Sequence, residues 1–251
     1  MKISIITVVY NCARTIQGCI ESVLAQDHDD VEYIIIDGGS KDGTVDIVKG
    51  FGDRIAKFIS EKDKGIYDAM NKGIKIATGD VVGILNADDF FYDTTTISQV
   101  AAAFKADPGL DATIADIVFV NDDNTRILRH YSAGKWRPSK FAWGFMPPHP
   151  SFFCKRHLFN ELGYYKIDYK IAADYELLIR YLYVNRINYQ YLSMKTTRMR
   201  MGGVSTRNIN SILTLNKEIK RACEENNLGT NFLKIYTKYL FKPFEFVLNN
   251  Q

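Results

Sequence analysis

The first 90 residues alternate between short apolar runs and helical patterns, and this alternation restricts the possible folds more than any other sequence feature. Ile3–Val9 is an apolar run of the kind found in a parallel strand that is covered on both faces. After it, apolar residues between positions 16 and 24 recur with the spacing of one helical face. Strands that alternate with helices form βαβ crossovers, so the sequence predicts an α/β fold built on a Rossmann-like, mainly parallel central sheet. The further predicted strands are 33–36, 55–59 and 81–85, and the further predicted helices are 44–51 and 66–77.

The pattern is less regular beyond residue 90, and no internal repeat or low-complexity linker divides the chain. Residues 135–151 are rich in Trp, Phe, Pro and Gly, which favours a shaped loop. Two amphipathic patterns, 211–226 and 232–248, predict a helical C-terminal tail. The other elements expected in this half are a helix at 96–106, strands at 112–120 and 125–131, and helices at 155–162 and 174–185.

The composition is that of an ordinary globular protein, with 46% hydrophobic and 24% charged residues among 251, which excludes disordered and collagen-like chains. No uninterrupted apolar stretch reaches the roughly 18 residues of a membrane span. The cysteines Cys12, Cys19, Cys154 and Cys223 lack the spacing of a metal site and are too few for a disulfide framework. We therefore expect reduced thiols and a cytoplasmic protein.

The net charge of +3 is too small to indicate nucleic-acid binding, but it is unevenly distributed. Residues 1–194 carry 22 basic and 25 acidic side chains, a net charge of −3, whereas residues 195–251 carry 10 and 4, a net charge of +6. In the tail, Lys234, Lys238 and Lys242 alternate with apolar residues. Such a segment can lie on an anionic membrane surface, and packing onto the rest of the protein is the alternative.

Polar and acidic residues follow the predicted strands, at the edge where open α/β sheets bind ligands. Asn86, Asp88 and Asp89 come directly after the strand 81–85 and offer oxygen ligands for Mn²⁺ or Mg²⁺, which can bridge a diphosphate. The alternative is a polar turn in which Asp88 or Asp89 caps the next helix.

Residues 37–44 combine three glycines with aspartates between a strand and a helix. Glycine lets a ligand approach the backbone, and an ionised Asp37 can accept hydrogen bonds from a base or a ribose. The segment fits neither the dinucleotide fingerprint nor the P-loop. Its simpler interpretation is a turn in which Asp42 caps the helix.

Taken together, these segments resemble the family 2 glycosyltransferases of the GT-A fold, of the type that makes bacterial polysaccharides. The resemblance spans residues 1–205. It implies a catalytic domain with a nucleotide-binding half, 1–90, an acceptor-binding half, 91–205, and a helical extension, 206–251. The matching segments are TVVYN at 7–11, IIDGGSKDGT at 35–44, NKGI at 71–74, ATGD at 77–80 and LNADD at 85–89.

The resemblance also implies roles for particular residues. The family's metal would lie at Asp88 and Asp89, where Asn86 replaces the usual first Asp. Gly38 likewise replaces an Asp that is common in the family, so the metal site is expected to have few carboxylate ligands. The residues expected to line the nucleotide pocket are Thr7, Val9, Asn11, Asp37 and Asp88.

Asp174 matches the position of the family's catalytic base. Inverting sugar transfer needs one carboxylate that takes the proton of the acceptor hydroxyl. The alternative is that Asp174 is the N-cap of the helix that follows it. The family usually has a Glu-Asp pair here, and this chain has Ala173 and Asp174.

His149, Arg198 and Arg200 are further candidates for contacts with the donor or the acceptor. His149 matches a histidine of polysaccharide-making members, and a purely structural role in a proline-rich loop is the alternative. The two arginines lie at the start of a segment, 198–205, that also contains glycines and could close over a diphosphate. The alternative is a sheet edge followed by a turn.

The resemblance thus implies an inverting glycosyltransferase that moves a sugar from a UDP- or GDP-sugar to a glycan or lipid-linked glycan acceptor, in cell-surface polysaccharide synthesis. It would act in the cytoplasm or at the inner face of the membrane, without a nucleic-acid partner. One alternative is a sugar nucleotidyltransferase, although the glycine- and arginine-rich loop expected after the first strand is replaced by Tyr10, Asn11 and Cys12. Another is a non-catalytic glycan-binding protein.

Overall fold

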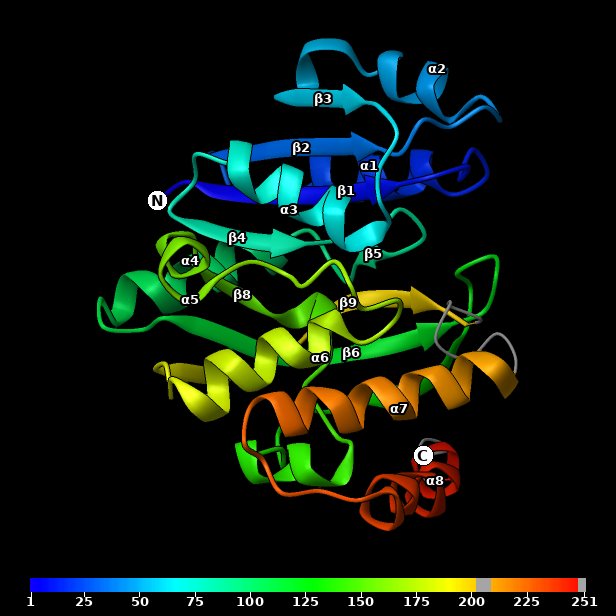
Figure 1. Cartoon of the computed structure of the whole chain (residues 1–251). Helices are drawn as coiled ribbons and strands as arrows, with labels where there is room; N and C mark the ends of the chain where they lie inside the picture. Colours follow the sequence, from blue (N-terminus) through cyan, green and yellow to red (C-terminus); the bar gives the residue numbers. More distant parts are fainter. Residues whose placement is uncertain (202–208, 248–251) are drawn as a thin grey trace.

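The computed structural model describes residues 1–201 and 209–247. In this part of the chain nine strands form one sheet with helices on both faces (Figure 1). The order across the sheet is β3-β2-β1-β4-β8-β6-β9-β5, and β7 pairs with β6 outside this path. The strands are β1 Ile3–Val9, β2 Val31–Asp37, β3 Lys57–Ser60, β4 Val81–Ile84, β5 Phe90–Phe91, β6 Ala112–Val120, β7 Ile127–Tyr131, β8 Phe153–Lys155 and β9 Tyr189–Arg200.

The four strands of the N-terminal half are parallel, as predicted. β1 pairs with β2 from Ile3 opposite Val31 to Val9 opposite Asp37, and it pairs with β4 on its other side. β2 in turn pairs with β3, where Asp37 lies opposite Ser60. The carboxyl ends of these strands therefore meet at one edge of the sheet, which lies on the right in Figure 1.

The second half of the sheet contains three strands that were not predicted, β5, β8 and β9. β8 is antiparallel to both β4 and β6 and lies between them, which leaves β6 parallel to β4. β9 then adds parallel to β6, and the short β5 adds antiparallel to β9. The sheet as a whole remains mainly parallel, and the predicted fold class is confirmed.

Helices cover both faces of the sheet and bury two apolar clusters against it. α1, α2 and α4 share one cluster with β1, whereas α3, α6 and α7 share the other. In Figure 1, α3, α6 and α7 lie in front of the sheet and α1 lies behind it. The helices are α1 Ile16–Leu24, α2 Thr44–Lys49, α3 Ile66–Ile76, α4 Thr96–Ala106, α5 His157–Leu162, α6 Ala173–Leu178, α7 Ile209–Glu225 and α8 Phe232–Val247.

α3 lies unusually close to the sheet and also holds the second half of the chain. A Cβ atom on Gly73 would lie 2.5 Å from Cγ2 of Ile6 in β1, so this position requires a residue without a side chain. Two residues earlier, the Asn71 amide donates to the Tyr165 carbonyl at 2.8 Å and accepts from the Tyr165 N–H at 3.0 Å. The NKGI segment therefore serves close packing and the link between the two halves.

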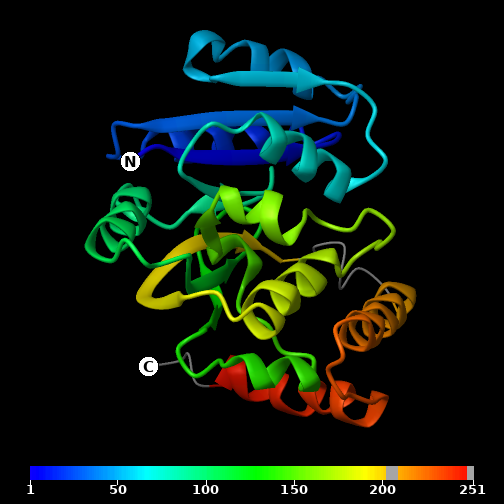
Figure 2. The same ribbon diagram turned by 60° about the vertical axis from the view of Figure 1, so that its left-hand side comes forward.

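The C-terminal helices pack onto the rest of the molecule. Ile219 and Cys223 of α7 and Ile235 of α8 are fully or almost fully buried in the same cluster as α6. α8 lies against the 3₁₀ helix Pro138–Trp143, as Figure 2 shows. In residues 1–201 and 209–247, no helix combines the length and the apolar character that are needed to cross a bilayer.

Candidate functional site

Asp37 organises the loop that follows β2. Its carboxylate is fully buried and accepts hydrogen bonds at Oδ2 from the backbone N–H groups of Gly39 and Ser40, both at 3.0 Å. Oδ2 also accepts from Oγ of Ser60 at the end of β3, at 2.7 Å, and Oδ1 accepts from the Ser40 hydroxyl. Asp37 thus holds the loops after β2 and β3 together from inside, and its expected contact with a nucleoside stays a prediction.

Asn11 connects the loop after β1 to the loop after β2. Its backbone N–H donates to Oγ of Ser40 at 2.7 Å, and its side-chain oxygen accepts from the Lys41 N–H at 2.9 Å. Asn11 adopts a left-handed conformation with φ of 51°, which asparagine tolerates better than most residues. Two other predicted pocket residues, Thr7 and Val9, have buried side chains, and Oγ1 of Thr7 accepts from the hydroxyl of Tyr33 at 3.1 Å.

The three polar residues after β4 differ sharply in environment. Asp89 is buried, and both this burial and the neighbouring charge of Asp88 raise its pKa well above the usual value. Asn86 donates from Nδ2 to Oδ2 of Asp89 at 3.3 Å, while its own Oδ1 is buried without a hydrogen-bond partner in the described part of the chain. Asp88 is half-buried. Asp88 is therefore the more accessible of the two carboxylates, and Asn86 presents an acceptor that no donor in the described part of the chain satisfies. A role of the buried Asp89 in metal binding stays a prediction.

This set of oxygens fits a site for Mn²⁺ or Mg²⁺ that has few protein ligands. Both ions prefer oxygen ligands, and Mg²⁺ is commonly bound by one or two carboxylates together with substrate phosphates and water. Asp88 supplies a carboxylate and Asn86 an unsatisfied amide oxygen. Within residues 1–201 and 209–247 no group of three or more His, Cys, Asp and Glu side chains could hold a metal ion. A metal here would therefore depend strongly on the diphosphate of the donor.

Asp63 is a residue of this edge that the sequence reasoning did not single out. A Cβ atom on Gly38 would lie 3.1 Å from Oδ2 of Asp63 and 3.4 Å from Cδ2 of Tyr10. The carboxylate of Asp63 therefore lies beside the space that a side chain at position 38 would enter. Nζ of Lys72 binds Asp63 at 2.5 Å and Glu61 at 2.7 Å. In the sequence, the only indication of this position is that the acidic residues Glu61 and Asp63 follow the third predicted strand.

Asp174 lies at the start of α6. The N-cap is Ala172, so the alternative that made Asp174 the N-cap is wrong by two positions. Oδ1 of Asp174 accepts from the Tyr175 N–H at 2.8 Å, and the hydroxyl of Tyr67, at the start of α3, lies 3.5 Å away. Burial raises the pKa of Asp174 to about 6, against these hydrogen bonds, which lower it. The result is a half-buried carboxyl group that is ionised at neutral pH and more basic than an ordinary Asp.

His149 lies inside the protein. It is 8% exposed, and its Nε2 lies 2.7 Å from the hydroxyl of Tyr165. Burial lowers the pKa of His149 to about 4, so the ring is neutral at pH 7. This environment supports the structural alternative, and a contact with donor or acceptor stays a prediction.

Arg198 and Arg200 lie at the end of β9. This agrees with the alternative interpretation, in which the two arginines belong to the sheet. Arg198 pairs with Phe90 and stacks over the ring of Tyr92 at 5.0 Å, and Arg200 stacks over the ring of Phe90 at 4.7 Å. The backbone N–H and the charge of Arg200 both lower the pKa of Asp89, against the larger effect of burial. The structure thus brings Arg200 beside Asp89, while the glycines of the predicted closing segment lie outside the described residues.

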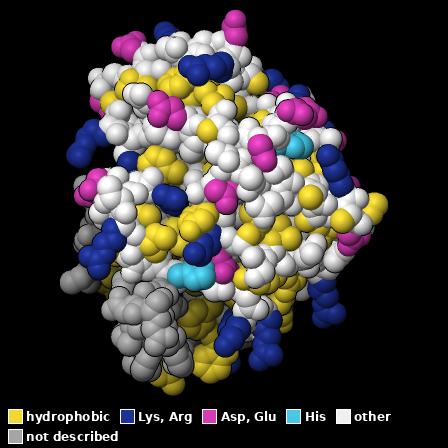
Figure 3. All heavy atoms as spheres, turned by 180° about the vertical axis from the view of Figure 1, so that it is seen from behind, with side chains coloured by type: hydrophobic (Ala, Val, Ile, Leu, Met, Phe, Trp, Pro, Cys, Tyr) yellow, Lys and Arg dark blue, Asp and Glu magenta, His cyan; other side chains and the backbone are white. Residues whose placement is uncertain are grey.

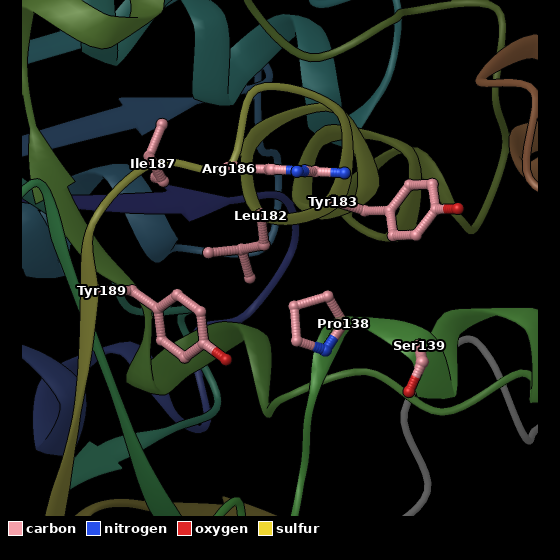
Figure 4. Close-up of a pocket in the computed structure, with 7 residues that line it drawn as sticks. All are labelled: Pro138, Ser139, Leu182, Tyr183, Arg186, Ile187 and Tyr189. Carbon is pink, nitrogen blue, oxygen red and sulfur yellow. The ribbon is translucent and has the colours of Figure 1, made fainter.

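An open hollow of 330 Å³ lies away from these residues, at the other end of the helix that begins near Asp174 (Figure 4). It is formed between the 3₁₀ helix Pro138–Trp143 and the π-helical continuation of α6, Ile179–Val184. No residue predicted for the site lines it. Its lining consists of Pro138, Ser139, Leu182, Tyr183, Arg186, Ile187 and Tyr189.

Comparison with known proteins identifies the family. The sequence model described as "Glycosyl transferase family 2" matches residues 4–167, which is more than half of the chain. The chain belongs to glycosyl transferase family 2. The family 2 chain is 31% identical over 180 residues to a PGL/p-HBAD biosynthesis glycosyltransferase from Mycobacterium bovis, which covers 70% of the chain and 68% of that relative. It is 28% identical over 247 residues to an uncharacterized glycosyltransferase from Rickettsia typhi, with 94% and 73% covered.

Solved structures confirm the GT-A fold of this family 2 member. S. aureus TarS 1–349 in complex with UDP-GlcNAc matches with a TM-score of 0.71 at 20% identity, over 91% of this chain and 68% of that chain. The mannosyltransferase PcManGT from Pyrobaculum calidifontis, in complex with GDP-Man and Mn²⁺, matches with a TM-score of 0.64 at 21% identity, over 88% and 64%. The protein is thus a glycosyltransferase, and the nucleotidyltransferase and non-catalytic alternatives find no support.

Proposed function

We propose that this glycosyltransferase transfers a sugar from a nucleotide diphosphate donor to a hydroxyl group of a glycan acceptor, with inversion at the anomeric carbon. The observation that carries the proposal is the half-buried carboxyl group of Asp174, whose pKa burial raises to about 6. Tyr67 at the start of α3 places Asp174 near the edge where the strands of the nucleotide-binding half end. A basic carboxylate at a ligand-binding edge suits proton abstraction from an acceptor.

The proposed reaction is a single displacement. The acceptor oxygen forms a bond to the anomeric carbon while its proton moves to a carboxylate oxygen of Asp174. The bond between the anomeric carbon and the diphosphate oxygen breaks, and its electron pair leaves with the nucleoside diphosphate. Asp88 and Asn86 would hold Mn²⁺ or Mg²⁺, and such an ion neutralises charge on a leaving diphosphate.

The donor in this proposal is a UDP- or GDP-sugar. TarS and PcManGT, which share the fold, were solved with UDP-GlcNAc and with GDP-Man. The pocket would be formed by the loops after β1, β2 and β4. Because the carboxylate of Asp37 is already engaged by its own loop, we expect it to act mainly through the shape of that loop. The residues assigned to the pocket are Thr7, Val9, Asn11, Asp37 and Asp88.

A membrane surface is the proposed setting of the acceptor. On α8, Leu233 is 79% exposed, and Phe232 and Tyr236 are also exposed; Trp143 lies nearby with Nζ of Lys234 5.7 Å from its ring centre. Viewed from behind, the lowest part of the molecule carries Lys and Arg side chains among hydrophobic ones (Figure 3). Exposed aromatic and basic side chains together suit an anionic lipid surface, where a lipid-linked glycan would be found.

Two measurements test the proposed function. Calorimetry with UDP, GDP and their sugars, with and without Mn²⁺, should show binding of at least one nucleotide; no binding under any condition would refute the transferase proposal. The variant Asp174→Asn should lower kcat by about 10²–10⁴-fold and leave donor affinity within about twofold, because the amide cannot accept the proton. Asp53→Asn, at an exposed Asp between α2 and β3, is the matched control and should keep wild-type activity.

A further inference from the structure

One carboxylate of the C-terminal extension holds the segment that leads into α6. Oε1 of Glu218, in α7, accepts from the Lys170 N–H at 2.8 Å, and Oε2 accepts from the N–H groups of Ile171 and Ala172, both at 2.9 Å. Hydrogen bonds from N–H groups to an ionised carboxylate are stronger than neutral ones. Three consecutive backbone N–H groups are thus fixed by a side chain that lies far along the sequence from them.

The same segment is held from the opposite side by α3. The hydroxyl of Tyr67 donates to the Ile171 carbonyl and also lies within reach of Oδ1 of Asp174. The Ile171 residue is therefore fixed at its N–H by α7 and at its C=O by α3. Asp174 follows three residues later, in the first turn of α6, so its backbone position depends on both contacts.

A second set of contacts fixes α7 itself against this region. Glu225, two turns after Glu218, binds Nζ of Lys166 and the hydroxyl of Tyr169, both at 2.8 Å. Arg221 binds Glu225 at 2.6 Å and also pairs with Asp168. Because Arg221 and Glu225 fix the C-terminal part of α7, a shift of α7 away from the segment 170–172 would break these contacts.

Glu218 also acts on Asp174 through its charge. The titratable groups that face Asp174 are Tyr67 from α3, Tyr165 from the segment before α6, and Glu218 from α7. Burial is the main cause of the raised pKa of Asp174, and the negative charge of Glu218 raises it further. Loss of that charge should therefore lower the pKa of Asp174.

We infer that Glu218 is a positioning residue for Asp174, so that α7 belongs to the active site and is more than a support for the catalytic domain. The inference rests on the proposed role of Asp174 as the base. A base has to meet the acceptor hydroxyl at hydrogen-bond distance, and a displacement of about 1 Å can cost on the order of 10²-fold in rate. Glu218 supplies this placement without touching a substrate.

Two variants of Glu218 test the inference, with Glu224→Gln as the matched control, because Glu224 is an exposed glutamate on the same helix. Glu218→Gln should lower kcat by about 10-fold or more while donor affinity changes by less than about twofold. The acid limb of its kcat–pH profile should also move to lower pH, a change that a general loss of structure would not produce. Glu218→Ala should in addition speed hydrogen exchange at the amides of Lys170, Ile171 and Ala172.

The outcomes separate this inference from the proposed function. If Asp174→Asn is inactive but the glutamine variant keeps both the wild-type kcat and the wild-type acid limb, Glu218 does not position the base. If Asp174→Asn itself turns over normally, the proposed base is wrong, whatever the Glu218 variants do. Should the alanine variant not fold, the glutamine variant, which retains one acceptor oxygen, decides the question.

Discussion

Asp174 meets two requirements that oppose each other in a folded protein. Partial burial makes its carboxyl group more basic, which suits the proposed proton transfer. The same burial disfavours the ionised form that the reaction needs, so the folded state loses free energy at neutral pH. Such a conflict between activity and stability is common at functional sites, and here it concerns a single side chain.

The first prediction concerns the pH dependence of transfer. A base has to be ionised to accept a proton, so kcat should rise with pH through an acid limb near 6, the pKa to which burial raises Asp174. Measurement of kcat between pH 4.5 and 8 at saturating donor and acceptor checks this. An acid limb near pH 4, the range of an ordinary Asp, would contradict it.

The second prediction concerns stability. Because the pKa of Asp174 is raised in the folded state, from 3.8 to about 6, the folded protein binds the proton more tightly than the unfolded chain. The stability contributed by protonation is thus complete below pH 4 and is lost as the pH rises to 6. Asp174→Asn removes this loss and should raise the free energy of unfolding at pH 7.5 by about 1–3 kcal/mol.

Urea unfolding at pH 7.5 and at pH 4 provides the measurement. The difference between Asp174→Asn and the wild type should be present at pH 7.5 and mostly absent at pH 4. If Asp174→Asn is less stable than the wild type at pH 7.5, the charge of Asp174 does not destabilise the folded state.

Sequence reasoning singles out residues that belong to motifs and passes over those that do not. Asp174, Asp37 and Asn11 were singled out because they lie in segments with a family pattern, and their roles stay predictions. Glu218 lies in a helix whose sequence shows only amphipathic spacing, and its role depends on which backbone it faces after folding. Asp63 was visible only as one acid in a charged loop. Neither position can be derived without the packing of distant segments.

At the scale of elements, the sequence predicted the strands and helices that are buried and regular. β1, β2 and β4 are almost completely buried, so each is an apolar run in sequence. β8 has three residues and is defined by its neighbours β4 and β6, so its own sequence carries little signal. β9 is mostly half-buried and contains register shifts against β6, which removes the regular alternation by which strands are recognised.

The third prediction concerns the contact between α3 and the sheet. Gly73→Ala places a Cβ atom 2.5 Å from Cγ2 of Ile6, so α3 or β1 has to shift. Overpacking should outweigh the gain in helix propensity and lower the free energy of unfolding by about 1–2 kcal/mol.

Thermal or denaturant unfolding of Gly73→Ala provides the measurement. Gly229→Ala is its control, since a Cβ atom there meets no atom within 4 Å and the stability should not fall. Equal stability of Gly73→Ala and the wild type would show that α3 is free to move away from β1.

At the scale of the whole molecule, the C-terminal helices combine two roles that the sequence had offered as alternatives. Ile235 of α8 is buried against the core, and the hydroxyl of Tyr239 binds Asn216 of α7 at 3.0 Å. Leu233, two residues before Ile235, is largely exposed. One face of the helix therefore packs onto the protein, and the other remains available for the proposed lipid surface.

The fourth prediction concerns this exposed face. The protein should bind vesicles that contain phosphatidylserine more strongly than vesicles of phosphatidylcholine alone, and binding should weaken as salt is raised. Leu233→Glu removes apolar area and adds a negative charge, so it should lower binding by about 10-fold or more.

Sedimentation with vesicles checks this prediction. Ile66→Glu, at an exposed apolar residue at the start of α3, is the matched control and should bind like the wild type. If both variants bind equally, or if the wild type ignores anionic lipid, α8 is not the contact surface.

The buried carboxylate of Asp37 has a consequence for the proposed binding of a donor nucleotide. By accepting hydrogen bonds from Gly39, Ser40 and Ser60, it completes the shape of the loop after β2 when the chain folds. A nucleotide that arrives at this loop does not have to order it, so little conformational entropy is lost on binding. If this loop forms part of the proposed donor pocket, the same rigidity favours a nucleotide whose shape fits a surface that is complete before binding.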